Sequence, residues 1–212
     1  MIEHAGSAAS PVTLTTPHLL WIPALPLLAF LLLIFTGRRL GRASAWVAVG
    51  ALAASCGGTL ALRQAVQDGY RLAVSWPWLS ATDSRWVIGL AVDGLTWIML
   101  FVVTVVGSLI ALYSIGYMHG DPRFPRFFAY FSLFCASMLT LVMADHFVLL
   151  YVGWELVGLC SYLLISFWFE KPAAAAAGRK AFITTRIGDT GLLLGILCLV
   201  FTQSPLQFQE LQ

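Results

Sequence analysis

The sequence predicts an all-α membrane protein with six transmembrane helices, and three observations support this class. Hydrophobic residues make up 59% of the 212 residues and charged residues only 10%, whereas a soluble domain carries about 25% charged residues. Six apolar runs are each close to the roughly 20 residues that a helix needs to cross the hydrocarbon core. The runs are continuously apolar and lack the alternation of barrel strands, which argues against a transmembrane β-barrel.

The six apolar runs divide the chain into five predicted parts. The runs cover residues 18–36, 43–62, 95–117, 127–144, 147–169 and 181–202. The parts are a two-helix segment 1–62, a loop 63–93, a third helix with its turn 94–126, three further helices 127–202 and a tail 203–212. Arginines follow the first run and no lysine or arginine precedes it, so this run is interpreted as a membrane helix and not as a cleaved signal peptide.

The distribution of basic residues predicts that both chain ends face away from the cytoplasm. Positive residues collect on the cytoplasmic side of membrane proteins. The first, third and fifth connections contain Arg38, Arg39, Arg42, Arg123, Arg126, Lys171, Arg179 and Lys180, whereas the second contains only Arg63, Arg71 and Arg85. The odd-numbered connections are therefore expected to be cytoplasmic, which gives an N-out, C-out arrangement.

The second connection predicts a short extracytoplasmic β-hairpin. Strand-forming residues at 70–76 and 86–92 flank the turn-rich segment 80–84. The nearby tryptophans Trp76, Trp78 and Trp86 are expected at the level of the lipid headgroups. An alanine run at 173–177, by contrast, is interpreted as a loop or the start of an interfacial turn.

Other sequence features exclude several kinds of chemistry. The cysteines stand singly in apolar runs and are interpreted as small core residues: Cys56, Cys135, Cys160 and Cys198. Phosphate-binding glycine loops, nucleophile elbows and zinc motifs are missing from the sequence, so no redox active site is predicted in this chain. A net charge of only +2 argues against nucleic-acid binding.

Glu155 is the most informative polar residue because it lies roughly 12 Å into the fifth run. A charge at that depth costs at least about 2.5–3.5 kcal/mol, so the carboxyl is protonated or paired and marks an ion or proton path. Tyr151 and Tyr162 share its helix face, and Gly158 leaves room for a partner helix or water. A neutral carboxylic acid that hydrogen-bonds a neighbouring helix is the open alternative.

Arg186 and Asp189 lie in the sixth run, three residues apart, so they share a helix face and can neutralise each other. If the last two helices are antiparallel, Asp189 is nearly level with Glu155, and the three charges can form one network. An ion pair that only fixes helix packing is an equally good interpretation. Gly191 and Gly195 have the spacing of a close helix contact.

Three residues at the outer ends of the runs have simpler expected roles. Asp93 and Asp145 precede the third and fifth runs, and both are expected to be helix N-caps. His146 could relay protons because the pKa of an unperturbed histidine is near neutrality. An interfacial histidine without that duty is the alternative.

Five segments of the chain resemble the subunit L family of NADH:quinone oxidoreductase, respiratory complex I. They read YMHGDP at 117–122, FFAYF at 127–131, GWELVGLCSYLLI at 153–165, KAF at 180–182 and RIGD at 186–189. The resemblance is strong over 93–195, whereas the first ninety residues fit only in pattern. The tryptophan-glutamate segment is the most specific part, because related cation/proton antiporter subunits share it in looser form.

The resemblance implies an antiporter-like membrane subunit that translocates protons and is driven by electron transfer elsewhere in the complex. This chain would hold no cofactor, and NADH, FMN, iron–sulfur clusters and quinone would be bound by partner subunits. Its partners would be other membrane subunits of complex I, the lipid bilayer and protons, with no nucleic acid. The implied location is the inner (cytoplasmic) membrane of a bacterium.

The resemblance also assigns roles to individual residues. In the family the glutamate that matches Glu155 is the proton-channel carboxylate and is paired with a lysine two helices later, while Arg186 and Asp189 match polar positions of the following helix. The predicted proton pathway consists of Glu155, Arg186, Asp189, Tyr151, Tyr162 and His146. The implied fold has two inverted five-helix units, each with a broken helix. Because only three helices of the first unit precede Gln212, we expect an N-terminal portion of a longer subunit.

Two other functions stay open from the sequence. One is the large subunit of a multi-subunit Na⁺/H⁺ antiporter or a related bicarbonate-uptake complex, which would work without NADH. The other is a non-transporting helical scaffold, in which Glu155, Arg186 and Asp189 form only buried polar contacts.

Overall fold

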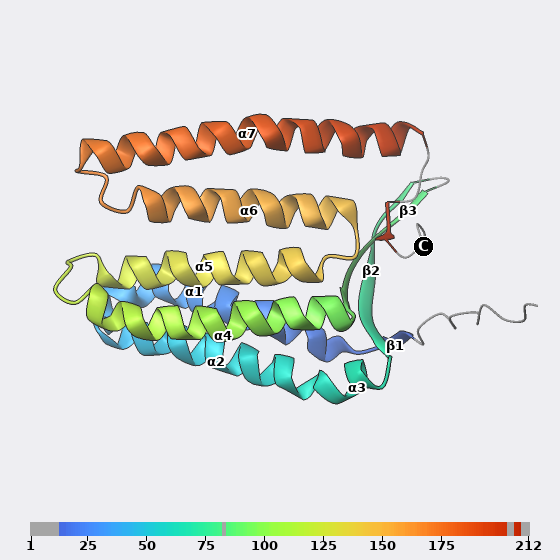
Figure 1. Cartoon of the computed structure of the whole chain (residues 1–212), viewed down its shortest axis with the longest axis horizontal. Coiled ribbons are helices and arrows are strands. Elements are labelled where there is room, and N and C mark those ends of the chain that lie inside the picture. The colour runs from blue at the N-terminus through green and yellow to red at the C-terminus, as the bar shows by residue number, and fades with distance from the viewer. Residues whose placement is uncertain (1–12, 82–83, 203–205, 209–212) are drawn as a thin grey trace, which may run out of the picture.

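The computed structural model describes residues 13–81, 84–202 and 206–208, and the side chains of 77–87 lie outside the description. Within these residues, six long helices lie side by side and a small sheet crosses one end (Figure 1). They are α1 (Trp21–Leu40), α2 (Ala43–Ala61), α4 (Gly94–Tyr117), α5 (Phe124–Met143), α6 (Phe147–Ile165) and α7 (Pro172–Phe201). Each is long and apolar enough to cross a membrane, which confirms the predicted class.

Short elements lead into and out of the first two helices. The 3₁₀ helix η1 (Pro17–Leu20) precedes α1 directly, and α3 (Arg63–Gln67) follows α2. α3 was not predicted, because its five residues lie within a segment that the sequence pattern indicated as a loop.

The start of α7 corrects one expectation. The alanine run at 173–177 is helical, so its interpretation as a loop or interfacial turn was wrong. Pro172 occupies the first turn of α7, where its missing N–H would have had no intrahelical partner, and alanine has the highest helix propensity. Local propensity therefore extends this helix well beyond the apolar run.

The two expected N-caps have different outcomes. The Asp93 side chain accepts a hydrogen bond from the Thr96 backbone N–H at 2.7 Å and caps α4 as predicted. Asp145 does not cap α6, so that expectation was wrong. The cap is His146, whose Nδ1 accepts from the Val148 N–H at 3.1 Å. Asp145 lies one residue further from the helix, where its N–H donates to the Gly89 carbonyl of the sheet.

The predicted hairpin is present and is part of a three-stranded sheet. Its strands are β1 (Thr13–Thr15), β2 (Arg71–Ala81) and β3 (Ser84–Val92), in that spatial order. β2 and β3 pair antiparallel, with Leu72 opposite Val92, and both extend further toward the turn than predicted. β1 pairs parallel with β2, and its three residues are too few to show an alternation in the sequence.

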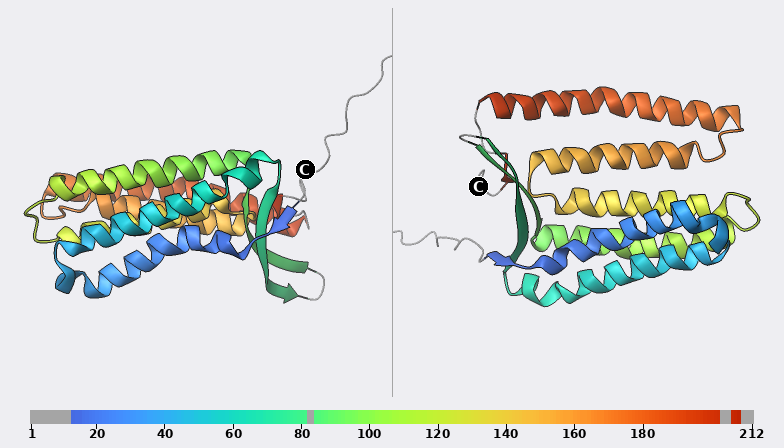
Figure 2. Two further views of the ribbon diagram at one scale, coloured as in Figure 1. Left: turned by 90° about the horizontal axis from the view of Figure 1, so that it is seen from below. Right: turned by 180° about the vertical axis from the view of Figure 1, so that it is seen from behind.

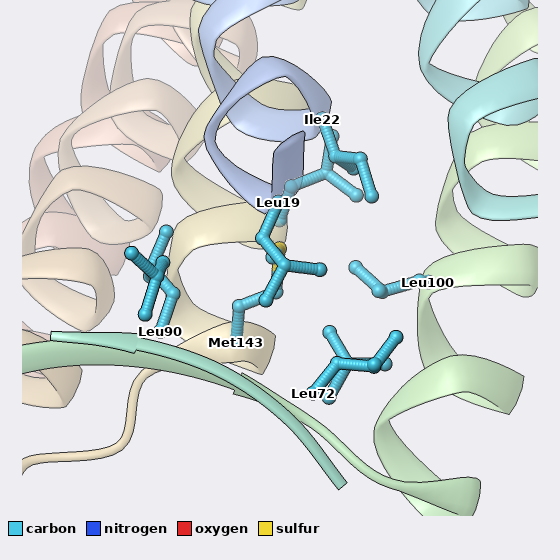
Figure 3. Packing of buried hydrophobic residues seen from close by; sticks show 9 residues of the cluster. Leu19, Ile22, Leu72, Leu90, Leu100 and Met143 are labelled. Atoms are coloured by element: carbon cyan, nitrogen blue, oxygen red, sulfur yellow. The ribbon is translucent and has the colours of Figure 1, made fainter. Parts of the chain in front are cut away.

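Two buried apolar clusters hold α1, α2, α4 and α5 together, and these four helices are called the packed bundle below. The first cluster packs the hairpin onto the helix ends and consists of Leu19, Ile22, Leu72, Val74, Leu90, Val92, Leu100, Leu139 and Met143 (Figure 3). The second, around Phe128, lies toward the other end and includes residues of α1, α2, α4 and α5 together with Phe167. The bundle is thus closed at both ends by apolar contacts.

The last two helices, called the α6–α7 pair below, extend the structure sideways from α5, with α7 beyond α6 (Figure 1). Gly153 permits the approach of α6 to α5, because an added Cβ would lie 2.9 Å from the Leu141 Cα. Gly178 permits the approach of α7 to α6, where a Cβ would lie 2.8 Å from the Ser166 Cβ. At Gly191 and Gly195 no described residue lies within 4 Å of an added Cβ, so the expected close helix contact is not formed among the described residues.

The connections that carry the excess of basic residues lie at the end opposite the sheet (Figure 2). The described residues therefore begin and end on the sheet side, as an even number of spans requires. Which side faces the cytoplasm stays a prediction. Cys135 and Cys160 are buried as expected of core residues, but Cys198 is exposed, so the interpretation was wrong for that residue.

Candidate functional site

Glu155 lies at the centre of α6, the ninth of 19 residues, on the side that faces α7. Its side chain is 16% exposed. The Gly153 contact with α5 lies two residues earlier and sets how closely this part of α6 approaches the packed bundle. The carboxyl is thus near mid-depth of a span, as the sequence predicted.

Arg186 of α7 pairs with Glu155 across the two helices. The guanidinium Nη1 donates to the Glu155 Oε2 in a salt bridge. The second carboxyl oxygen, Oε1, is buried and accepts no hydrogen bond from the described residues. One oxygen of Glu155 is therefore held by a cation, while the other is free to accept a proton or another donor.

Asp189 has a different partner from the one expected. The indole N–H of Trp154 donates to the Asp189 Oδ1 at 2.8 Å, and Asp189 is only 4% exposed. The expected neutralisation of Arg186 by Asp189 is not formed. Both α7 residues point toward α6, where they contact two adjacent residues. Glu155 forms a salt bridge with the Arg186 guanidinium, and Trp154 donates a hydrogen bond to the Asp189 carboxylate. Two polar contacts therefore tie the middle of α6 to the middle of α7.

Aromatic side chains extend this site along α7. The Arg186 guanidinium lies 4.6 Å from the centre of the Phe182 ring, which can stabilise its charge by a cation–π contact. The Phe182 ring in turn contacts Tyr162 of α6, with a centroid distance of 5.4 Å. Tyr162 is thus connected to the site through Phe182 and makes no hydrogen bond to Glu155 among the described residues.

The other two predicted pathway residues lie further from the charges. Tyr151 is one helical turn before Glu155 and is half-buried, without a described hydrogen bond to Glu155 or Arg186. His146 is at the first residue before α6, roughly 13 Å from Glu155 along the helix axis, and is 3% exposed. The structure therefore brings Glu155, Arg186 and Asp189 together and leaves Tyr151 and His146 at the periphery.

Trp154 and Phe182 also belong to the site, although neither was predicted from the sequence. A partly buried tryptophan usually finds an acceptor for its indole N–H, and that tendency was the available signal for Trp154. Phe182 gave no signal, because its contact with Arg186 depends on the helix face that α7 presents. Within the described residues there is no group of three or more potential metal ligands.

An ion pair outside the membrane core lies at the sheet end of α6. Arg71 of β2 donates to the Asp145 Oδ1 at 2.6 Å, with both side chains largely buried. Burial raises the pKa of the Asp145 carboxyl above its ordinary value, although the nearby Arg71 opposes the change. The pair joins the hairpin to the connection between α5 and α6.

Two family models match this chain over parts of its length. One, described as the N-terminus of chain 5 of NADH-ubiquinone oxidoreductase (complex I), covers residues 78–128. The other, described as NADH:quinone oxidoreductase/Mrp antiporter, covers residues 144–212, which include the whole α6–α7 pair. Together they match more than half of the chain. The chain belongs to this antiporter-like family of membrane subunits.

Similar proteins come from distant organisms. NADH-quinone oxidoreductase subunit L of Mycobacterium tuberculosis is 44% identical over 90% of this antiporter-like chain, which covers 31% of that protein. The chloroplast NAD(P)H-quinone oxidoreductase subunit 5 of Zygnema circumcarinatum is 49% identical over 81% of the chain, which covers 24% of that protein. The chain thus spans about a third or less of these relatives.

Solved structures resemble the fold as well. A chain of the Mrp complex from a Dietzia species has a TM-score of 0.72 and 26% identity, over 88% of this chain and 20% of that one. A chain of the archaeal membrane-bound sulfane sulfur reductase has a TM-score of 0.74 at 20% identity, over 91% of this chain and 29% of that one. The second likeness concerns the fold alone.

Proposed function

We propose that this chain is part of a proton-translocating membrane subunit of an NADH:quinone oxidoreductase in a bacterial cytoplasmic membrane. The names of the relatives from Mycobacterium tuberculosis and Zygnema circumcarinatum support membership of such a complex. Other membrane subunits would flank the chain. NADH, FMN, iron–sulfur clusters and quinone would be bound by partner subunits, and the residues of this chain would take no part in the redox chemistry.

The main support for this proposal is the carboxyl of Glu155, of which one oxygen pairs with Arg186 and the other is buried without a partner among the described residues. A carboxyl in the middle of a membrane span is costly and is kept where it serves an ion or proton path. A nearby cation favours the charged form of a carboxylate, and burial favours the neutral form. Glu155 is subject to both influences, so a small movement of Arg186 would change which form is stable.

The proposed cycle uses residues of the α6–α7 pair. With Arg186 in contact, Glu155 is a carboxylate. A proton that binds at the free oxygen discharges Glu155 and releases Arg186, whose side chain is 43% exposed and has room to move. Arg186 then pairs with Asp189, three residues away on the same face of α7. Its return to Glu155 expels the proton toward the next acceptor of the path.

Replacing Glu155 by glutamine in the complete complex tests the proposal. Proton transport into reconstituted vesicles is measured with a pH-sensitive dye and divided by the rate of quinone reduction. We expect this ratio to fall in Glu155→Gln while the complex still assembles, because glutamine fills the same space but cannot carry the proton. Glu170→Gln is the matched control, since Glu170 is an exposed carboxyl that pairs with Arg123 at 2.7 Å outside the spans. An unchanged ratio in assembled Glu155→Gln would contradict the proposal.

A charge reversal separates transport from a purely structural role. In the double variant Glu155→Arg with Arg186→Glu, the salt bridge between α6 and α7 can form again with its partners exchanged. If the pair only fixes helix packing, the double variant should recover assembly and proton transport together. We expect recovery of assembly without transport, because the proton-binding group would then sit on the other helix.

Cation/proton antiport without NADH is the second candidate function. It is supported by the structural similarity to a chain of the Mrp complex, which has 26% identity. Vesicles of the complete protein distinguish the two functions. Transport driven by quinone reduction supports the first, and a proton flux that requires a sodium gradient and no electron donor supports the second.

A further inference from the structure

A cavity of about 780 Å³ opens at the end of the packed bundle opposite the sheet. Its walls come from the end of α1, the start of α2, and the connection between α4 and α5. The volume is within the roughly 300–1,000 Å³ of pockets that bind small molecules. The cavity is separate from the Glu155 site, which lies between α6 and α7.

The polar side of this cavity carries an excess of positive charge. Four arginines line it, Arg38, Arg42, Arg123 and Arg126. Arg123 is already paired, because its two terminal nitrogens donate to Glu170 at 2.7 and 2.9 Å. The other three have no carboxylate partner among the described residues and are exposed.

The one carboxylate of the cavity wall is occupied by other donors. Asp121 accepts hydrogen bonds from the Trp168 indole and the Arg123 backbone N–H, both at 2.8 Å. Burial would raise the pKa of Asp121, but these two hydrogen bonds and the charge of Arg123 lower it below its ordinary value. Asp121 therefore stays charged, and its carboxyl oxygens are directed to Trp168 and Arg123 and not to the three unpaired arginines.

The apolar side of the cavity continues into the membrane-facing surface. Leu33 and Ile34 of α1 and Ile115 of α4 line it, and Ile34 is 43% exposed. Trp46 of α2 stands at the rim and is 63% exposed, which is typical of a tryptophan at the level of the lipid headgroups. A ligand that fills this cavity therefore meets cations at one end and an apolar helix surface at the other.

We propose that the cavity binds an anionic phospholipid, with the phosphate held by Arg38, Arg42 and Arg126 and the acyl chains lying along α1 and α2. Charge complementarity supports this occupant, because basic pockets between transmembrane helices bind anionic headgroups. The general excess of positive residues on the cytoplasmic side of membrane proteins does not explain why these three arginines line the cavity. Arg39 follows Arg38 directly and is also exposed, yet it does not line the cavity.

Photolabelling of the complete complex in vesicles tests the proposal. The probe is phosphatidylglycerol with a photoreactive group on an acyl chain, and the labelled residues are located by mass spectrometry. We expect labelling beside Ile34 and Trp46. Each arginine near an anionic surface contributes about 1 kcal/mol, or about fivefold in affinity, so removing three should weaken binding about a hundredfold. The variant is Arg38→Gln, Arg42→Gln and Arg126→Gln combined, and Arg39→Gln is the matched control.

The outcomes distinguish a specific lipid site from its alternatives. Strong labelling in the wild type and in Arg39→Gln, with loss in the triple variant, supports the proposal. Equal labelling by phosphatidylcholine would show that the headgroup charge is not recognised. Displacement of the probe by inorganic phosphate alone would show a free anion site. Absence of labelling in the assembled wild type would show that protein covers the cavity. Each of the last three results would overturn the proposal.

Discussion

The packed bundle and the α6–α7 pair differ in how much of their surface the chain itself covers. In the most apolar stretch of each helix, between 28% and 50% of the residues are buried in the packed bundle, but only 11% in both α6 and α7. Among the described elements, α7 packs chiefly against α6. The paired charges of the membrane core lie in this second region.

Polar residues inside the two regions also behave differently. In the packed bundle, polar side chains donate to backbone carbonyls, either within their own helix, as Thr104 does to Leu100 at 2.8 Å, or on a neighbouring helix, as Ser55 of α2 does to Ile22 of α1 at 2.8 Å. In the α6–α7 pair, Glu155 and Asp189 find partners only across the two helices. Regions with few buried apolar contacts open at low free-energy cost. The charged groups are therefore placed where small helix movements can change their pairing.

Truncation of a core side chain in the packed bundle is expected to have the largest effect on stability. Phe128 is fully buried in the packed bundle, and its ring contacts the Phe124 ring in a tilted arrangement at a centroid distance of 4.8 Å. Phe128→Ala should lower the free energy of unfolding by about 3–5 kcal/mol. Phe201→Ala, at an 84% exposed position of α7, should change it little. Thermal unfolding of the detergent-solubilised protein measures both, and equal losses would contradict the contrast between the regions.

Substitution of Gly153, where α6 packs against α5, is expected to have an intermediate effect on stability. Gly153→Ala places a Cβ 2.9 Å from the Leu141 backbone, which cannot move aside as a flexible side chain can. We expect Gly153→Ala to lower the free energy of unfolding by about 1–3 kcal/mol and to reduce proton transport, because α6 shifts away from α5. Gly158→Ala has open space at its Cβ, so the higher helix propensity of alanine should stabilise α6 by up to about 1 kcal/mol. The same sign of change in both variants would show that α6 does not approach α5 at Gly153.

The smallest expected effect is a pH dependence at the two membrane surfaces. Burial raises the pKa of Asp145 at the sheet end, so the folded chain binds this proton more tightly than the unfolded chain does. The resulting stability is present below the ordinary pKa of about 3.9 and is lost as the pH rises through the folded value. Relative to Asp145→Asn, the wild type should lose stability as the pH rises through that range.

Asp121 at the opposite end should behave in the reverse way. Its pKa is lowered in the folded chain, so its contribution to stability is present above about pH 3.9 and is lost as the pH falls through the folded value. Melting temperatures of the wild type, Asp145→Asn and Asp121→Asn between about pH 3 and 7 measure both signs. Equal slopes for the two variants would contradict the assigned environments.

Much of the architecture could be predicted from local patterns. The six spans and the hairpin between α2 and α4 follow from apolar length and residue type. The Asp93 cap followed from its position before a helix, but the same rule failed at Asp145. There the backbone N–H of Asp145 donates to the Gly89 carbonyl of β3, a contact between residues far apart in the sequence that no local rule predicts.

The depth of the charged residues in the membrane can be predicted from the amino-acid order, because it depends on the distance of Glu155, Arg186 and Asp189 from the ends of their apolar runs. Their pairing depends on how the helices pack. Arg186 forms a salt bridge with Glu155, and Asp189 accepts a hydrogen bond from Trp154, because the rotation and register of two packed helices determine which side chains meet. The spacing of residues along one helix predicts which side chains are neighbours on that helix, but it does not predict which side chains of another helix they meet.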